Sequence, residues 1–356
     1  MAAHSPTAPV AEKATGAIFA LRPGEITQAP TRLQSLVCAG FRRLSFLFSC
    51  SIILLVTFIV LRIAISAAPA MRSEGLSFFS GRVWDLNADK FGIAAEIWGT
   101  LYTSILALLI GSAFGVAAAV FLSEGYLGQS IFVILKGLNL HLHPLWSRLP
   151  ASTEEMLKQL IELLAAIPSV VYGLWGLFVV IPLIRPTCNM IHANFGWMPL
   201  FSTNLSGPGV MPAVIVLAIM ILPTVTAISR DALTAVPPKL RMAAYGLGAT
   251  RWESILFVIL PTASRGIFGG MVLAFGRALG ETMALAMLVG NSSKISASVF
   301  SPADTLASLL ANHFPEAGHR EVGMLMYAAL VLLGITLIVN IFGALILQRA
   351  SRSAAE

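Results

Sequence analysis

Six long stretches of apolar residues with almost no charges dominate the pattern of this 356-residue chain. Each stretch has 18 to 27 residues, long enough for a helix to cross a hydrocarbon layer of about 30 Å. Only a helix satisfies all of its backbone groups within one segment in lipid, and short alternating strands typical of a membrane barrel are absent from the sequence. The pattern therefore predicts an all-α polytopic membrane protein with six transmembrane helices. The predicted spans are residues 44–61, 97–123, 163–184, 210–229, 266–291 and 322–348.

The composition agrees with this fold class and excludes a soluble globular enzyme. Apolar residues make up 57% of the chain and charged residues 11%, and the mean hydropathy is +0.83. A soluble domain carries about 25% charged residues. The net charge of +6 does not indicate nucleic acid, because the basic residues lie between the apolar runs. Cys38, Cys50 and Cys188 have neither disulfide nor metal spacing.

The distribution of basic residues predicts the orientation in the membrane. If both tails and the connections 124–162 and 230–265 lie on one side, that side holds 15 of the 23 lysines and arginines, and the other connections hold seven. The excess predicts that both termini are cytoplasmic. A signal peptide cleaved near residues 68–70 is the less favoured alternative, because the charged region before the first span is too long. We expect a disordered tail over 1–43, a first helix and extracytoplasmic loop over 44–96, a five-helix core over 97–348 and a tail over 349–356.

Arg277 and Glu281 are the only charged residues inside a predicted span. They are one helical turn apart and so point to the same side, on a narrow face that they share with Gly266, Gly270, Leu273 and Ala284. An ionised group near the bilayer centre costs about 2.5–3.5 kcal/mol, so this face should meet protein or water. We favour a substrate pathway, because apolar residues would pack at less cost. An ion pair that only locks helix packing is the alternative.

Pro168 in the third span also indicates a polar spot. It removes the amide that would bond to the Leu164 carbonyl, so we expect a kink there. Ser169 and Tyr172 lie on the adjoining face with two glycines, a spacing that suits either a wet cavity or close helix packing. We include both residues in the candidate substrate pathway.

The connection over residues 230–265 contains the run PPKLRMAAYGLG at 237–248. Proline suits a first helical turn and Gly248 suits a helix stop, so we expect a short helix, a turn and a second helix. The smooth surface at Ala243 and Ala244 would fit a groove on another protein. A helix lying passively on the membrane is the alternative.

This connection resembles the EAA loop of ABC-importer permeases, and we call it the coupling loop. In that family Glu-Ala-Ala is followed four residues later by glycine, and the loop ends in Ile-x-Leu-Pro. Val258 replaces the isoleucine, and Met242 stands where the family has glutamate, which removes an acid expected to meet a basic partner surface. The matching residues, which the resemblance assigns to ATPase coupling, are Ala243, Ala244, Gly248, Leu260 and Pro261.

Two further stretches resemble one subfamily, the PstC permeases of phosphate-specific ABC transporters. They read ELLAAIPSVVYGLWGLF at residues 162–178 and GRALGETMA at 276–284, and the resemblance extends over about residues 97–348. It implies import of inorganic phosphate through a bacterial inner membrane. The implied partners are a second, PstA-like permease, a dimer of PstB-like ATPases and an extracytoplasmic phosphate-binding protein. Residues 125–153 are longer than the loop usual in this family, and we interpret them as a surface or interfacial insertion in which His141 and His143 lack further metal ligands.

No phosphate-binding Gly-x-x-x-x-Gly-Lys-Ser/Thr loop and no hydrolase motif occurs, so we expect a transporter subunit without catalytic residues, cofactor or ATPase activity. A permease for molybdate or sulfate is an alternative. A secondary anion transporter is another, but it would have no ATPase to dock at the coupling loop.

The last extracytoplasmic connection contains Ser301-Pro302-Ala303-Asp304, whose spacing resembles a capping box with proline at the first helical position. It predicts a short exposed helix over 305–313. Its Asp304, together with Glu316, would either contact the binding protein or lie on a helix that only orders the loop.

Overall fold

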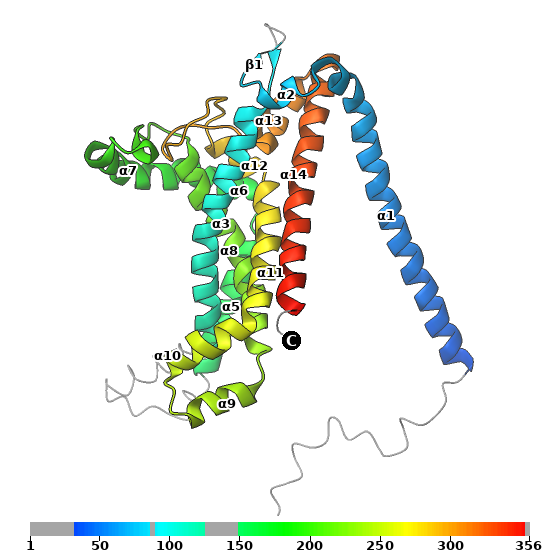
Figure 1. The fold of residues 1–356 in the computed structure, drawn as a ribbon, viewed down its shortest axis with the longest axis vertical. Helices are drawn as coiled ribbons and strands as arrows, with labels where there is room; N and C mark the ends of the chain where they lie inside the picture. Colours follow the sequence, from blue (N-terminus) through cyan, green and yellow to red (C-terminus); the bar gives the residue numbers. More distant parts are fainter. Residues whose placement is uncertain (1–31, 86–89, 125–148, 353–356) are drawn as a thin grey trace, which may run out of the picture. The chain divides into compact units, whose positions relative to one another are not determined.

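The computed structural model describes residues 32–85, 90–124 and 149–352 (Figure 1). The expectations for residues 1–31, for 353–356 and for most of the insertion, including His141 and His143, lie outside the described residues. Six helical stretches are long and apolar enough to cross a membrane. The prediction of an all-α protein with six membrane-spanning helices is therefore confirmed. These stretches are Leu36–Glu74, Ala94–Ser123, Ser169–Phe195, Val210–Thr234, Arg251–Leu279 and His319–Arg349.

The elements follow one another in this order. The helices are α1 (Arg32–Glu74), α2 (Ser77–Ser80), α3 (Ala94–Ser123), α5 (Leu149–Ala166), α6 (Ser169–Trp175), the π-helical turn η3 (Gly176–Val180), α7 (Ile181–Phe195), the short 3-10 helix η4 (Pro199–Phe201), α8 (Val210–Thr234), α9 (Pro238–Gly246), α10 (Arg251–Ser254), the π-helical turn η5 (Ile255–Ile259), α11 (Leu260–Leu279), α12 (Met283–Leu288), α13 (Leu306–His313), the 3-10 helix η6 (Phe314–Glu316) and α14 (His319–Arg352). The strands β1 (Trp84–Asp85) and β2 (Lys90–Phe91) form an antiparallel hairpin.

The chain divides after Leu61 into two units, which we describe separately. In the described part of the first unit, the side chains of α1 are exposed on all sides, including Leu47, Ile53 and Phe58. Such a surface suits lipid. Residues 32–43 are helical rather than disordered as we expected. The reason is that Pro30 is the last proline before Pro69, and the apolar residues after it extend the helix.

The second unit is built around α8, the most buried of the spans. Glycines on its neighbours allow close approach. A Cβ atom at Gly111 of α3 would lie 2.8 Å from Cγ1 of Ile221, and one at Gly266 of α11 would lie 2.4 Å from Cβ of Ala232. Gly115 and Gly270 repeat these contacts one turn away. Small residues at four-residue spacing are the usual means of packing membrane helices closely.

The start of α8 is satisfied by the loop between α12 and α13. The amide groups of Gly209, Val210 and Met211 donate hydrogen bonds of 2.8–3.0 Å to the carbonyls of Leu288, Ser301 and Val299, respectively. First-turn amides of a helix have no acceptor within the helix. Here the carbonyls of this loop are the acceptors, a role that water or a polar side chain has in other helices.

The expected exposed helix over 305–313 is buried instead. α13 begins at Leu306 and its cap is Thr305, whose hydroxyl accepts from the Ser308 amide. Asp304 lies under this helix, where Thr305 and Ser308 donate to its carboxylate. The prediction of a Ser301 cap was wrong: the Ser301 carbonyl accepts from the Val210 amide of α8, and the helix begins five residues later, at Leu306.

Two of the predicted spans do not form one continuous helix. Residues 163–184 are interrupted at Ile167–Pro168, ahead of the membrane-spanning stretch that begins at Ser169, and residues 266–291 are interrupted at Gly280–Thr282, after the stretch that ends at Leu279. The single helix expected over 266–291 was therefore wrong. Each π-helical turn ends two residues before a proline, Pro182 or Pro261. Because proline has no N–H and its ring crowds the carbonyl four residues earlier, the wider turn accommodates it.

Candidate functional site

The two helix breaks lie in neighbouring elements of the bundle. α6 packs against α12, and Figure 1 shows both at the same level, toward the end that carries α13. A Cβ atom at Gly173 would lie 2.7 Å from Sδ of Met287, and one at Gly176 would lie 2.6 Å from Cδ1 of Leu288. These glycines therefore serve close packing, one of the two interpretations that their spacing left open.

Pro168 leaves a carbonyl without its helical donor, as the sequence predicted, and Tyr172 satisfies it. The Tyr172 hydroxyl donates a 2.7 Å hydrogen bond to the Leu164 carbonyl. The Tyr172 ring is buried, and Ser169 is half-buried at the first turn of α6. Tyr172 is thus a clamp across the break, since it bonds the last turn of α5 from the second turn of α6.

Arg277 and Glu281 do not form the expected ion pair. Arg277 lies in the last turn of α11, and the chain leaves the helix at Gly280, whose amide donates to the Arg277 carbonyl at 3.2 Å. Glu281 consequently does not lie one helical turn above Arg277. Within residues 32–85, 90–124 and 149–352, the side chains of Arg277 and Glu281 form no hydrogen bond and no ion pair with each other or with another side chain.

Arg277 is exposed and lies in the last turn of α11, directly before the second break. The last turn of a helix also favours a cation. The expected face divides: Gly266 and Gly270 pack on α8, whereas Leu273 and Arg277 are exposed further along α11. An exposed guanidinium with free donors can bind an oxyanion in a bidentate manner.

The coupling loop forms the helix, turn and second helix that the sequence predicted. α9 and α10 lie at the end of the bundle opposite α13 (Figure 1). Gly248 has φ of +84°, and the Ala249 and Gly248 amides donate to the Ala244 and Tyr245 carbonyls. This arrangement is a Schellman ending, which requires the left-handed conformation that glycine adopts without strain. The predicted helix stop at Gly248 is confirmed.

The two alanines of the loop differ in exposure. Ala244 is only 6% exposed and faces the loop's own core, whereas Ala243 is exposed. The outer surface also carries Met242 and Leu247, which are 72% and 90% exposed. We call Met242, Ala243 and Leu247 the outer face of α9. Leu260 and Pro261 lie at the start of α11, directly after η5.

Sequence reasoning missed a cluster of charges that holds the coupling loop. Arg241 Nη1 donates to Oε1 of Glu124 at 2.5 Å, and Arg251 Nη2 donates to the Glu124 carbonyl at 2.9 Å. Glu124 ends α3 and lies 117 residues from Arg241 in sequence. The available signal was an acid directly after an apolar run and an arginine next to the Ala-Ala motif.

The described residues contain no group of three or more His, Cys, Asp or Glu side chains that would hold a metal ion. The features that stand out are breaks beside the third and fifth membrane helices, an exposed arginine next to the second break, and a helical loop between the fourth and fifth spans. Together they define a membrane transport permease.

Comparisons with known proteins agree with this class. The family model described as binding-protein-dependent transport system inner membrane component matches residues 146–352. A phosphate transport system permease protein PstC from Mesorhizobium japonicum is 38% identical over 285 residues, 79% of each chain. The PstC protein of Haemophilus influenzae is 36% identical over 321 residues, which cover 89% of this chain and 95% of the relative. The chain belongs to this family of inner membrane transport components, and within it to the PstC permeases.

The solved structures support the fold. A bacterial ABC transporter involved in the import of the acidic polysaccharide alginate matches with a TM-score of 0.54 at 14% identity, over 88% of this chain and 98% of that chain. At this identity the likeness shows a shared fold alone. The prediction of an ABC-importer permease fold is confirmed, as is a multi-pass protein of the inner membrane.

Proposed function

We propose that this protein is the membrane subunit through which an ATP-driven importer moves inorganic phosphate. The proposal is supported by the exposed Arg277 at the broken fifth span, and by relatives at 36–38% identity that are phosphate transport permeases. Phosphate is a small multivalent oxyanion, and a guanidinium is suited to its geometry. The substrate is moved and not chemically changed.

The pathway passes the two breaks. Arg277 offers the positive charge that an anion needs in a low-dielectric passage, while the nearby Glu281 limits how tightly the anion is held. Ser169 borders the passage from the start of α6. Tyr172 stabilises the break beside the passage through its hydrogen bond to the Leu164 carbonyl. The exposed side chains of Leu273 and Met283 would face the second permease, so the passage lies between two subunits.

The partners follow from the same reading. A second, PstA-like permease completes the passage, a PstB-like ATPase dimer docks on the outer face of α9, and an extracytoplasmic phosphate-binding protein delivers the anion at the α13 end. In this arrangement the coupling loop and both termini are cytoplasmic, which agrees with the excess of basic residues on that side. ATP-driven closure of the ATPases moves the loop and re-aims the passage.

The test is ATP-dependent phosphate uptake by the complete transporter in proteoliposomes. Arg277→Gln should lower uptake roughly a hundredfold while the complex still assembles, because the anion then meets a neutral group at the passage. Arg277→Lys keeps the positive charge but loses the bidentate donors, so its uptake rate should lie between those of the wild-type and Arg277→Gln transporters. Arg265→Gln, an exposed arginine earlier on α11, is the matched control and should leave uptake near the wild-type rate.

Normal uptake by an assembled Arg277→Gln transporter would remove Arg277 from the pathway. Uptake that continues without ATP would contradict the importer mechanism itself. Competition by molybdate or sulfate at concentrations equal to phosphate would show that the substrate is another oxyanion.

A further inference from the structure

The ends of α3 and α8 near the coupling loop are held by arginines of that loop. Glu124 ends α3, and its carbonyl accepts from Arg251 Nη2 at 2.9 Å. Leu233 lies in the last turn of α8, and its carbonyl accepts from Arg241 Nη2 at 3.1 Å. The last carbonyls of a helix have no partner within it and carry partial negative charge, so cations are favoured there.

Arg241 binds both helices at once. Its Nη1 donates to the Glu124 carboxylate at 2.5 Å while Nη2 reaches α8. The Glu124 side chain is 4% exposed and that of Arg241 is 22% exposed. A guanidinium has several donors in a fixed plane, so one arginine can hold two acceptors in a defined geometry that a lysine does not reproduce. A buried pair of this kind fixes position strongly, because neither charge tolerates loss of the other.

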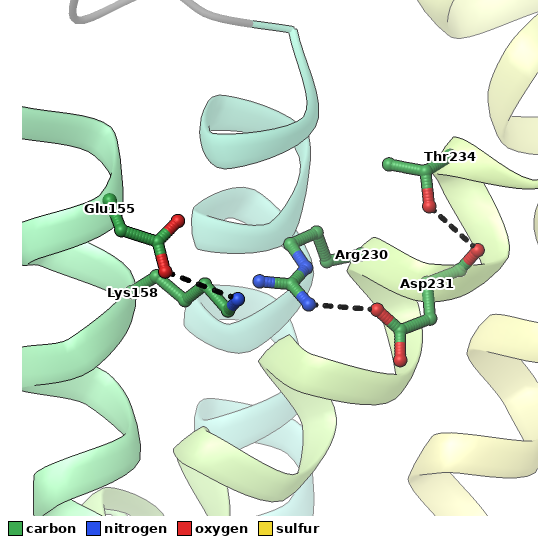
Figure 2. A network of polar contacts seen from close by, with 5 residues as sticks. All are labelled: Glu155, Lys158, Arg230, Asp231 and Thr234. Carbon is green, nitrogen blue, oxygen red and sulfur yellow. Dashed lines mark hydrogen bonds and ion pairs between the residues drawn. The ribbon is translucent and has the colours of Figure 1, made fainter. Parts of the chain in front are cut away.

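Most other ion pairs of the described residues do not have this connecting role. Figure 2 shows two of them: Lys158 pairs with Glu155 at 3.4 Å within α5, and Arg230 pairs with Asp231 at 2.9 Å within α8. Both pairs join residues of a single helix. The fourth, between His313 and Glu321, joins α13 to α14 far from the coupling loop in sequence. The Arg241–Glu124 pair, by contrast, joins α9 to the end of α3 across 117 residues of sequence.

The helices that Arg241 holds are themselves closely packed. Gly111 and Gly115 allow α3 to approach Ile221 and Val225 of α8. Met242, the residue after Arg241, is 72% exposed on the outer face of α9. In α9, the residue that binds α3 and α8 (Arg241) is therefore directly followed by a residue of the exposed outer face (Met242). A displacement of the outer face reaches the α3–α8 pair through Arg241.

We propose that Arg241 is the positioning residue that transmits motion of α9 to α3 and α8, through Glu124 and the Leu233 carbonyl. The inference rests on the proposed docking of an ATPase on α9. It assigns to the α3–α8 pair the role of a single body that moves with the loop. Arg251 is the second attachment, through the Glu124 carbonyl.

The experiment measures phosphate moved per ATP hydrolysed by the reconstituted complete transporter, together with ATPase co-purification. Arg241→Gln should retain the bound ATPase and its hydrolysis, while phosphate moved per ATP falls roughly tenfold. Glu124→Gln should lose part of this amount, because it removes one of the two Arg241 contacts, and the double variant should lose no more than Arg241→Gln, because the Glu124 carboxylate acts through Arg241. Arg241→Lys should recover part of the ratio. Asp231→Asn, which breaks a pair inside α8, is the matched control and should keep the wild-type ratio.

A wild-type ratio in assembled Arg241→Gln would overturn the proposal. So would additive losses in the double variant, or release of the ATPase by Arg241→Gln, because release would show that Arg241 only folds the docking surface. Failure of the proposed function itself is distinguishable, since the wild-type protein would then bind no ATPase and move no phosphate.

Discussion

Tyr172 shows how one hydroxyl group replaces a lost backbone hydrogen bond. Pro168 removes the donor that the Leu164 carbonyl would have in a regular helix, and the Tyr172 hydroxyl takes its place at 2.7 Å. The sequence indicated the orphaned carbonyl, because the four-residue spacing of helical hydrogen bonds fixes which group loses its partner. It did not indicate the replacement donor, since several nearby groups share that face.

The clamp can be tested by restoring the missing donor. Tyr172→Phe should lower the free energy of unfolding by about 1 kcal/mol, the usual net worth of a hydrogen bond. In a Pro168→Ala background the new amide at 168 can donate to Leu164, so the same substitution should then cost much less. Thermal unfolding of the four purified proteins measures both values. An equal cost in both backgrounds would show that the hydroxyl does not act as the substitute donor.

Asp304 is a second residue with a measurable signature. It is buried under α13, and burial raises the pKa of its carboxyl above the ordinary value of 3.8, partly offset by hydrogen bonds from Ser308 and Thr305 and by the charge of His313. The ionised form therefore costs the folded protein stability at neutral pH. This cost is relieved as the pH falls through the raised pKa toward 3.8.

Asp304→Asn should remove this pH dependence, since asparagine is neutral at every pH and still accepts both hydrogen bonds. The stability of the variant relative to wild type should therefore be higher at neutral pH than near the ordinary carboxyl pKa of 3.8. Melting temperatures of both proteins at the two pH values measure the difference. A pH-independent difference would mean that Asp304 titrates as an exposed carboxyl does.

At the scale of elements, the coupling loop separates residues that fold it from residues that it presents. The sequence predicted the helix, the stop at Gly248 and the second helix, because proline and glycine set these boundaries locally. It did not separate Ala243 from Ala244, since which alanine faces inward depends on how α9 packs against η5. Motif residues alone therefore do not define the docking surface.

Two aspartate substitutions separate the two roles. Leu247 is 90% exposed, so Leu247→Asp should leave the melting temperature unchanged but reduce ATPase co-purification strongly, because a charge enters a desolvated contact. Ala244→Asp should lower the melting temperature, because the charge is buried inside the loop. Leu76→Asp, at an 83% exposed position outside the coupling loop, is the control. Retained ATPase binding by Leu247→Asp would place the docking surface elsewhere.

The break between α11 and α12 was not predicted by the hydropathy pattern. Apolar residues flank the run Gly280-Glu281-Thr282 on both sides, and glycine is common in membrane helices, so Gly280 alone does not predict an end. The prediction that Arg277 and Glu281 share a helix face assumed one continuous helix. Because the helix ends between them, they do not share that face. The first break was indicated locally by Pro168, whereas no proline marks the second, which lies where α12 leaves α11 and packs against α6.

At the scale of the whole molecule, the second unit is held together by contacts between segments remote in sequence. The number and approximate places of the spans followed from the length of apolar runs, since lipid leaves few alternatives. The Arg241–Glu124 pair did not follow, because the acid after an apolar run and the arginine beside the Ala-Ala motif are each visible in the sequence, but their pairing across 117 residues is not. The membrane-spanning helices could thus be predicted from the sequence, whereas the contacts between helices remote in sequence could not.

The polar face at the start of α3 has a consequence for the order in which the protein is made. Glu96, Thr100 and Ser104 are buried, and the Leu306 amide, 206 residues later, donates to the Thr100 hydroxyl. Gly99 allows the Asp304 backbone to lie directly against α3. Until the ribosome has delivered that late loop, the nascent α3 presents an uncovered carboxyl and hydroxyls within an apolar helix. The second span therefore reaches its final packing only after the loop that precedes the last span has been made.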